Sequence, residues 1–335
     1  MLKDIDVSVK ICGKSKKMPN FVASLNHTGR IRTQMSQTFD QLIVRLHNQE
    51  RRKHIAVACP NDGHTLNVIR RSLDEGIADF ALVAEAGNSH EAEQIQAQYP
   101  DRVTLYTAED TAEAARLAVS LVHKGEADVL MKGTLNTDVL LRAVLNKEEG
   151  LLPAGNVLSH VTVAQLPTYH KLLLFSDAAV VPRPRVSHFE AMIRYNLKVC
   201  NRLGISEPQV ALIHCTEKIN GKFPHTLGYV ILKERARKGQ YGPVQIDGPM
   251  DAKTACDPHS AEVKGIESSV VGNADMLIFP NIESSNTFYK AISLFGQAHM
   301  AGMLTGTTAP VVLPSRADSD DSKYYSLVLA CTMAE

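Results

Sequence analysis

A serine and an arginine stand together where an apolar run near the carboxyl end of the sequence stops. The run Val311–Pro314 is followed by Ser315 and Arg316, and Ser319 precedes a stretch of helical periodicity that begins at Asp320. Serine is a good N-cap, and acidic side chains are favourable in the first turn of a helix. A hydroxyl, a guanidinium and the unpaired N–H groups of a helix start together suit a phosphate. We therefore predict an anion site at this turn, with a capped helix carrying a surface arginine as the plainer alternative.

Two other apolar runs end in polar residues of the same kind. Lys132, Gly133 and Thr134 follow one of them; a lysine can contact phosphate, and a glycine permits close approach of the backbone. Asn286 and Thr287 follow a later run, where a helix start would expose amide, hydroxyl and N–H groups. An ordinary capped turn explains that later segment equally well. Ligands of α/β proteins bind at the carboxyl ends of parallel strands, so these loops are the first candidates for a binding site.

These loops are positioned by a repeating pattern of short apolar runs and amphipathic stretches. The runs are nearly continuous rather than alternating, which is typical of strands buried on both faces of a mainly parallel sheet. The predicted strands are His54–Cys59, Asp79–Glu85, Val103–Tyr106, Ala127–Lys132, Lys171–Val180, Val210–Cys215, Val244–Asp247, Ala274–Pro280 and Val311–Pro314. The predicted helices are Thr38–Arg51, Gly63–Asp74, His90–Gln98, Asp110–Val122, Asp138–Leu145, His188–Leu203, Ser260–Glu267, Asn286–Met300 and Asp320–Thr332. This alternation predicts an α/β fold with helices on both faces of the sheet.

Length and composition limit the class of protein. The chain has 335 residues, enough for two domains, and its 44% hydrophobic content can bury a core. Its 36 basic and 36 acidic residues balance, which disfavours nucleic acid and anionic membrane as partners. The beginning of the sequence lacks a secretory apolar run, no segment approaches about 18 uninterrupted apolar residues, and the six cysteines are scattered without a C-x-x-C pair. We expect a cytoplasmic protein with reduced thiols and no metal site.

Five segments, taken in order, resemble the phosphate acetyl/butyryltransferase family, and more closely its butyryltransferase branch. They are Leu130–Thr137, Leu173–Pro184, Val244–Ala252, Ala274–Ile292 and Val311–Ala330, within a resemblance that runs from residue 52 to the end of the sequence. The resemblance implies two three-layer α/β domains with mainly parallel sheets and an interdomain cleft, an architecture like that of isocitrate and isopropylmalate dehydrogenases. Domain 1 would be discontinuous, residues 51–153 and 303–335, and domain 2 would span 154–302. Residues 1–50 break the strand–helix pattern and are expected to form an extension packed on domain 1.

The same resemblance implies an activity. The family transfers an acyl group reversibly between coenzyme A and inorganic phosphate, here a butyryl group or else an acetyl or branched one, giving an acyl phosphate. Coenzyme A and phosphate are substrates, no metal or redox cofactor is implied, and a homodimer or higher homo-oligomer is expected. Ser315 and Arg316 would be catalytic. The residues expected to bind phosphate or acyl phosphate are Lys132, Gly133, Thr134, Asn286 and Thr287.

The resemblance leaves the general base open. Counted without gaps, the position of the acetyl branch's proposed aspartate base is Ser322 in this sequence. Asp321 is the preferred catalytic carboxylate, with Asp318 or no carboxylate as alternatives. Asp318 and Arg142 are also the residues expected to contact coenzyme A.

Two other classes of function compete with this interpretation. A metal-dependent dehydrogenase of the isopropylmalate type needs clustered aspartates for a divalent ion, and no such series follows a predicted strand. A non-catalytic acyl-CoA-sensing domain would not need the Ser315–Arg316 pair. Binding of coenzyme A without NAD(P) would exclude the dehydrogenase, and turnover would exclude the sensing domain.

Overall fold

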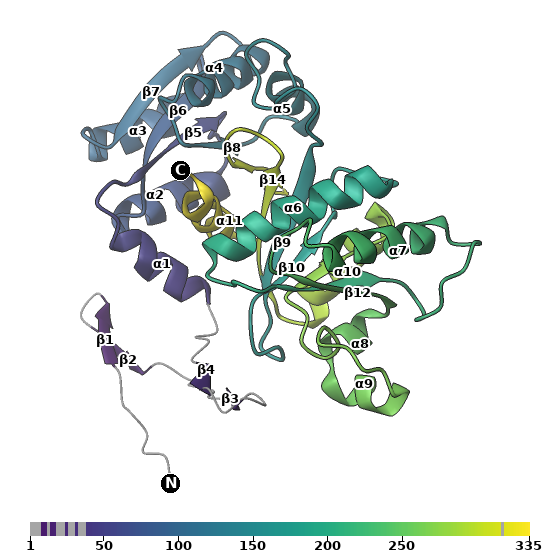
Figure 1. The fold of residues 1–335 in the computed structure, drawn as a ribbon. Coiled ribbons are helices and arrows are strands. Elements are labelled where there is room, and N and C mark those ends of the chain that lie inside the picture. Colours follow the sequence, from purple (N-terminus) through teal and green to yellow (C-terminus); the bar gives the residue numbers. More distant parts are fainter. Residues whose placement is uncertain (1–7, 12–13, 18–23, 26–30, 33–37, 316–317) are drawn as a thin grey trace. The chain divides into compact units, whose positions relative to one another are not determined.

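Eleven strands form the central sheet of the computed structural model (Figure 1). The structure describes residues 8–11, 14–17, 24–25, 31–32, 38–315 and 318–335. Residues 1–37 and 38–335 are two separate units. In the first, β1 (Ser8–Ile11) pairs antiparallel with β2 (Lys14–Lys17), and β3 (Ser24–Leu25) with β4 (Ile31–Arg32). The rest of the predicted N-terminal extension up to residue 37 lies outside the described residues, whereas α1 (Phe39–His47) belongs to the second unit.

The sheet consists of two parallel sets of strands joined by an antiparallel pair. Its order is β12-β11-β13-β10-β9-β14-β15-β8-β5-β6-β7. The strands are β5 (Lys53–Ala58), β6 (Ala78–Glu85), β7 (Val103–Ala108), β8 (Val129–Lys132), β9 (Ser159–Gln165), β10 (Leu173–Ser176), β11 (Gln209–Ile213), β12 (Gln245–Met250), β13 (Met276–Ile278), β14 (His299–Thr305) and β15 (Val311–Val312). From β15 to β7 and from β12 to β10 all pairs are parallel, while β9 and β14 pair antiparallel with each other and with their outer neighbours. The predicted α/β fold with a mainly parallel sheet is confirmed.

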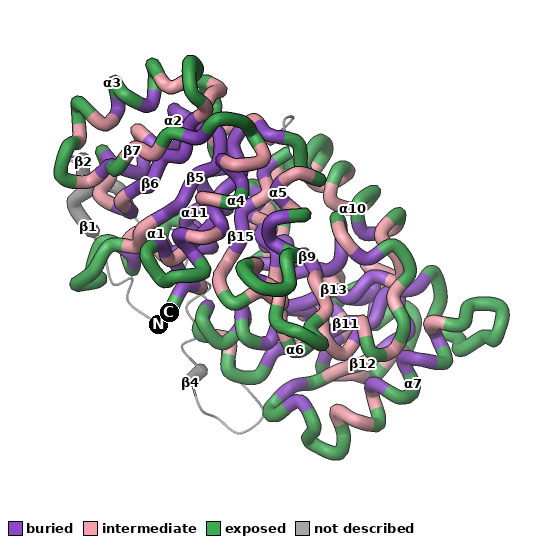
Figure 2. Tube along the Cα trace, turned by 90° about the horizontal axis from the view of Figure 1, so that it is seen from above, coloured by how far each residue is buried: buried purple, intermediate pink, exposed green. Residues whose placement is uncertain are grey.

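Both faces of the sheet are buried, because alternate residues of each strand point to opposite sides. Ile55 and Val57 of β5 lie in a core that continues across both parallel sets, whereas Ala56 and Ala58 lie in a second core on the other face. A third core covers that other face beneath the second parallel set. Figure 2 shows the buried positions along the strands and the exposed ones on the outer sides of the helices. Because the strands are buried on both faces, their sequences are continuous apolar runs and do not alternate between apolar and polar residues.

Helices cover these faces. They are α2 (Gly63–Asp74), α3 (His90–Gln98), α4 (Thr111–His123), α5 (Thr137–Val144), α6 (Val186–Arg202), α7 (Pro224–Arg237), α8 (Ala252–Cys256), α9 (Pro258–Lys264), α10 (Ile282–Phe295) and α11 (Asp320–Met333). The last helix packs against α1, α2 and β14, and every residue from Lys323 to Thr332 is buried. Ser319 is its N-cap, as predicted, and its hydroxyl accepts a hydrogen bond of 3.2 Å from the backbone N–H of Ser322.

Two predicted elements have clearly different bounds in the structure, and others were missed. The strand predicted over Lys171–Val180 is confined to Leu173–Ser176. The helix predicted over Asn286–Met300 begins at Ile282 and ends at Phe295, since Gly296 closes it and β14 begins at His299. The antiparallel strands β9 and β14 and the helix α7 were not predicted. The segment His299–Thr305 is poor in β-branched residues, and pairing with strands on both of its sides makes it a strand.

Candidate active site

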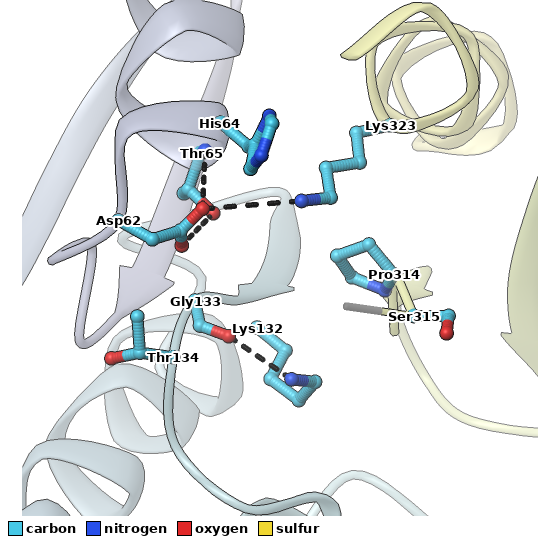
Figure 3. A pocket seen from close by; sticks show the side chains of 9 residues that line it. All are labelled: Asp62, His64, Thr65, Lys132, Gly133, Thr134, Pro314, Ser315 and Lys323. Atoms are coloured by element: carbon cyan, nitrogen blue, oxygen red, sulfur yellow. Dashed lines mark hydrogen bonds and ion pairs between the residues drawn. The ribbon is translucent and has the colours of Figure 1, made fainter. Parts of the chain in front are cut away.

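A cavity of about 320 Å³ lies beyond the carboxyl ends of β5, β8 and β15, three neighbouring parallel strands (Figure 3). Its lining comes from the start of α2, the β8–α5 loop, the end of β15 and α11, and consists of Asp62, His64, Thr65, Lys132, Gly133, Thr134, Pro314, Ser315 and Lys323. A second cavity of about 350 Å³ shares Lys132, Pro314 and Ser315 with the first and continues to the start of α5. The two cavities therefore meet at the residues that follow β8 and β15.

The β8–α5 loop crosses tightly over the end of β5. The backbone N–H of Gly133 donates to Ala58 O at 2.8 Å, and that of Thr134 donates to Cys59 O at 2.9 Å. A Cβ on Gly133 would lie 2.0 Å from Cys59 O, so only glycine fits at this crossing. Lys132 is buried, and its ammonium donates to Gly133 O at 3.0 Å and to Leu135 O at 3.2 Å. Lys132 thus holds the loop in the shape that lines both cavities.

The start of α2 brings a carboxylate to the opposite wall. Asp62 is the N-cap of α2, accepting hydrogen bonds from the backbone N–H of Thr65 at 2.9 Å and from its hydroxyl at 2.6 Å. Partial burial alone would raise the pKa of Asp62, but the hydrogen bonds from Thr65 and the charge of Lys323 outweigh it and lower that pKa. The Asp62 side chain is therefore an anion fixed in position by its own helix turn.

The α11 side of the cavity carries a buried lysine. Lys323 is only 4% exposed, and Figure 3 shows its side chain reaching from α11 toward Asp62. The Lys323 ammonium lies 3.9 Å from Asp62 Oδ1. Nearby, His64 Nδ1 lies 2.6 Å from Asp320 Oδ1, so a second pair also connects the starts of α2 and α11.

Asp318 links Ser315 to the second parallel set. One oxygen of the Asp318 carboxylate accepts from the backbone N–H of Ser315 at 2.8 Å, and the other accepts from the hydroxyl of Tyr289 on α10 at 3.2 Å. Burial, and secondarily the charge of Asp318, raises the pKa of Tyr289, which keeps that hydroxyl a donor. Burial lowers the pKa of His160 on β9, while the charges of Asp177 and Asp318 oppose this. The Asp318 carboxylate is therefore ordered beside Ser315 and faces groups from both halves of the sheet.

The predicted site residues divide into those that line the cavity and those that do not. Lys132, Gly133, Thr134 and Ser315 lie together around it. Arg316 lies outside the described residues.

Two charged residues of the prediction pair elsewhere. The Asp321 carboxylate is exposed and accepts from Arg71 at 2.8 Å, so it does not line the cavity. Arg142 is exposed on α5 and pairs with Asp138 at 3.3 Å. Its predicted contact with coenzyme A stays a prediction.

Asn286 and Thr287 are exposed on the second turn of α10, because that helix is capped by Asn281 and begins at Ile282, four residues before the predicted start at residue 286. The side-chain amide of Asn286 donates to Ala178 O at 3.0 Å. The N–H groups at the start of α10 therefore precede these two residues, and their predicted phosphate contact rests on the side chains alone.

Sequence reasoning missed five residues of this region: Asp62, His64, Thr65, Tyr289 and Lys323. Asp62 follows β5 as Ser315 follows β15, so the same search of strand ends would have found it. Lys323 is the one charged residue in the otherwise uncharged stretch Ser322–Met333. A lysine within an apolar helix is rarely buried without a partner, so this pattern indicates a functional or paired charge. Tyr289 had no such signal, because its contact with Asp318 depends on how α10 packs.

The structure defines an α/β protein with a cavity, lined by two lysines and a serine among other residues, at the carboxyl ends of adjacent parallel strands. Among the residues that the structure describes, no group of three or more His, Cys, Asp or Glu side chains is arranged to hold a metal ion. Within the same residues, no helix combines the length and apolar character needed to cross a membrane.

The chain belongs to the family described as "Phosphate acetyl/butaryl transferase", whose sequence model matches residues 95–331. It is 37% identical over 301 residues to a phosphate butyryltransferase of Clostridium beijerinckii, covering 90% of this chain and 99% of that protein. It is 34% identical over 283 residues to a phosphate acetyltransferase of Thermotoga maritima, covering 84% of this chain and 95% of that protein. The crystal structure of a branched-chain phosphotransacylase from Enterococcus faecalis superposes with a TM-score of 0.74 at 28% identity, covering 84% of this chain and 98% of that one. The resemblance found in the sequence is confirmed.

Proposed function

We propose that this protein transfers a short acyl group reversibly between coenzyme A and inorganic phosphate. The observation that carries the proposal is the cavity at the ends of β5, β8 and β15, where Ser315 and the family's Lys132–Thr134 segment meet in a chain that belongs to this family. A lysine ammonium and a serine hydroxyl suit a phosphate that must attack a carbonyl.

The reaction needs two anionic substrates aligned in one site. A phosphate oxygen attacks the thioester carbonyl, a C–O bond forms, the C–S bond breaks, and the thiolate leaves. We assign Arg316 to hold the phosphate and offset its charge, as a guanidinium does bidentately. Ser315 donates its hydroxyl to the carbonyl or phosphoryl oxygen as negative charge develops there. Lys132 contributes its charge from the loop that it orders.

In the direction of acyl-CoA synthesis, the thiol of coenzyme A must lose a proton. We assign this role to Asp318 instead of Asp321. The hydrogen bonds of Asp318 with Ser315 and Tyr289 support the choice, as does the pairing of the exposed Asp321 with Arg71. The Asp318 carboxylate accepts a hydrogen bond from the backbone of Ser315, which lines both cavities, so we place the thiol beside Ser315 to meet the first requirement of a general base, proximity.

We propose butyryl-CoA as the preferred acyl donor, with acetyl- and branched acyl-CoA as the alternatives to be compared. The support is the 37% identity to a phosphate butyryltransferase. One methylene changes discrimination by only about 1–3 kcal/mol, so related substrates should also react. Acyl exchange between a thiol and phosphate requires no oxidation, and we propose that coenzyme A and phosphate act as substrates without a further cofactor. The five described cysteines are free thiols, which suits the proposed cytoplasmic location.

The finer architecture is also a proposal. We propose two three-layer domains with a cleft between them, residues 51–153 with 303–335 and residues 154–302. The two parallel strand sets and the separate second and third cores support this division. We likewise propose that this arrangement is like that of the isocitrate and isopropylmalate dehydrogenases.

A homodimer is the proposed assembly. On α7 and the loop before it, five apolar residues are each 42–53% exposed and form an apolar stripe: Ile219, Phe223, Leu227, Val230 and Ile231. Within α7, the spacing of three and one residues places Leu227, Val230 and Ile231 on one face, which a second copy can cover by two-fold symmetry. Leu227→Glu should convert the dimer to a monomer in light scattering, whereas Val263→Glu, on α9 and outside the stripe, should not. A wild-type protein that runs as a monomer at micromolar concentration refutes the assembly.

The test of the function measures thiol release from acetyl-, butyryl- and isobutyryl-CoA, with and without inorganic phosphate. We expect release that depends on phosphate and is fastest with butyryl-CoA, and we expect Arg316→Ala to lower turnover while leaving the unfolding temperature unchanged. Thiol release at the same rate with and without phosphate would refute the transferase. So would the absence of thiol release from a protein that measurably binds coenzyme A. The latter result would instead support an acyl-CoA-sensing domain.

A further inference from the structure

Lys323 carries a buried charge that its neighbours satisfy only in part. Its side chain is 5% exposed. Within the described part of the chain, its ammonium pairs with the Asp62 carboxylate at 3.9 Å, which is beyond hydrogen-bond distance. An ammonium has three donors, and a buried charge is costly unless those donors find acceptors. Lys323 lines the cavity, so the space beside it is the place where a missing acceptor can enter.

Two other lysines with little exposure do make short hydrogen bonds within the fold. Lys171 lies 2.7 Å from Asp275 Oδ1 and donates to Asn273 O at 2.8 Å. Lys132 donates to two carbonyls of its own loop. Both ammonium groups make short hydrogen bonds within the fold, so burial alone does not explain the long contact of Lys323.

The charges around the cavity indicate the chemistry of the missing group. Among the lysines and carboxylates of the lining, Lys132 and Lys323 contribute two positive charges and Asp62 one negative charge, an excess of one positive charge. The Asp62 carboxylate already accepts two hydrogen bonds from Thr65, which hold it in the helix cap and keep it from moving toward the lysine. A small mobile anion is the complement of such a lining.

We propose that Lys323 binds the phosphate that attacks the thioester, or the phosphoryl group of the acyl phosphate, and that Asp62 holds the ammonium in place while the cavity is empty. This inference rests on the proposed function and extends it to a residue on α11. Lys323 acts by binding and does not transfer a proton, so its loss should raise the KM for phosphate far more than the KM for acyl-CoA. One charge-assisted hydrogen bond lost corresponds to about 10- to 100-fold in that KM.

The test compares Lys323→Met, Lys323→Arg, Asp62→Asn and the control Lys171→Met. Methionine keeps most of the side-chain volume and removes the charge, so the helix should still pack. The first readout is the rise in unfolding temperature caused by inorganic phosphate, with potassium chloride at equal ionic strength as the reference. The second is the KM for phosphate and for butyryl-CoA.

We expect Lys323→Met to lose the phosphate-induced stabilisation and to raise the KM for phosphate by 10- to 100-fold, with the KM for butyryl-CoA changed less than threefold. Lys323→Arg should retain part of both responses. Asp62→Asn keeps a capping side chain and removes the competing carboxylate, so the KM for phosphate should fall. Lys171→Met should lower the unfolding temperature without changing the response to phosphate.

A purely structural salt bridge predicts something else. Lys323→Met and Asp62→Asn would then lose similar stability and keep the wild-type response to phosphate, which would overturn the proposal. If the wild-type protein releases no thiol from any acyl-CoA, the proposed function fails, and the phosphate-induced stabilisation still decides the role of Lys323. Absence of that stabilisation in the wild type would overturn both the anion site and this residue's part in it.

Discussion

Gly133→Ala tests whether the tight crossing of the β8–α5 loop over β5 builds the cavity. The added Cβ would lie 2.0 Å from Cys59 O, 2.6 Å from Cys59 C and 2.7 Å from Ala58 O. All three atoms belong to the backbone of a buried strand end, so no side chain can rotate away. The loop must instead move outward by about 1 Å or more before the methyl group fits.

The cost follows from the contacts that such a movement breaks. The hydrogen bonds from Gly133 to Ala58 O and from Thr134 to Cys59 O would lengthen or break, at about 1 kcal/mol each. Overpacking of the strand end adds about 1–3 kcal/mol. The free energy of unfolding should therefore fall by about 3–5 kcal/mol. With a urea dependence of about 3 kcal/mol per molar, the midpoint shifts down by about 1–1.7 M.

The assay is urea unfolding followed by circular dichroism, with turnover measured well below the midpoint. Turnover should fall even in the folded variant, because Lys132 and Thr134 move with the loop. Gly63→Ala is the matched control, since nothing lies within 4 Å of its Cβ in the first turn of α2. That substitution should stabilise the protein by about 0.5 kcal/mol. A wild-type midpoint for Gly133→Ala would show that the crossing is not as tight as described.

Three further predictions concern the residues around the site. Asp318→Asn should lower kcat at least 100-fold and Asp321→Asn less than threefold in steady-state assays, and the reverse order would return the base to Asp321. Ser319→Ala removes the N-cap of α11 and should cost about 1 kcal/mol in chemical unfolding; no change would mean that the cap is redundant. Burial, and secondarily the charge of Glu85, raises the pKa of Cys59 from 9.0 to about 12. The buried neutral thiol of Cys59 therefore contributes fully to the free energy of unfolding below pH 9, and this contribution is lost as the pH rises toward 12. Cys59→Ala should flatten the fall in unfolding temperature above pH 9, and parallel curves would contradict this.

Local periodicity was enough to predict most of the fold. The helices Gly63–Asp74 and His90–Gln98 have the predicted bounds, and every predicted strand is present at least in part. These elements are recognisable because caps and apolar spacing are properties of neighbouring residues. β14 was missed because its conformation depends on pairing with β9 and β15, which no window of local sequence reveals.

The sequence predicted only those site residues that directly follow a predicted strand. Lys132, Gly133, Thr134 and Ser315 follow apolar runs directly, and the structure gathers them around one cavity. Asp321 was preferred on its place in the sequence, but the turn of α11 directs its carboxylate to Arg71. Contacts between segments far apart in the chain are set by packing, and those were the ones that residue spacing did not predict.

The cavity is assembled from segments that lie far apart in the sequence, residues 62–65, 132–134 and 314–323, so they become available at different times during protein synthesis. Asp62 leaves the ribosome about 260 residues before Lys323, which at roughly 5–20 residues per second is an interval of about 13–52 s. During that time β5, β6, β7 and β8 can form, but β14, β15 and α11 are still missing, and the apolar surface that α11 later covers has no partner. A nascent chain is therefore exposed to aggregation and to chaperones for most of its synthesis. The cavity forms only when residues 311–333 have emerged, so shorter nascent chains lack the wall that Ser315 and Lys323 supply.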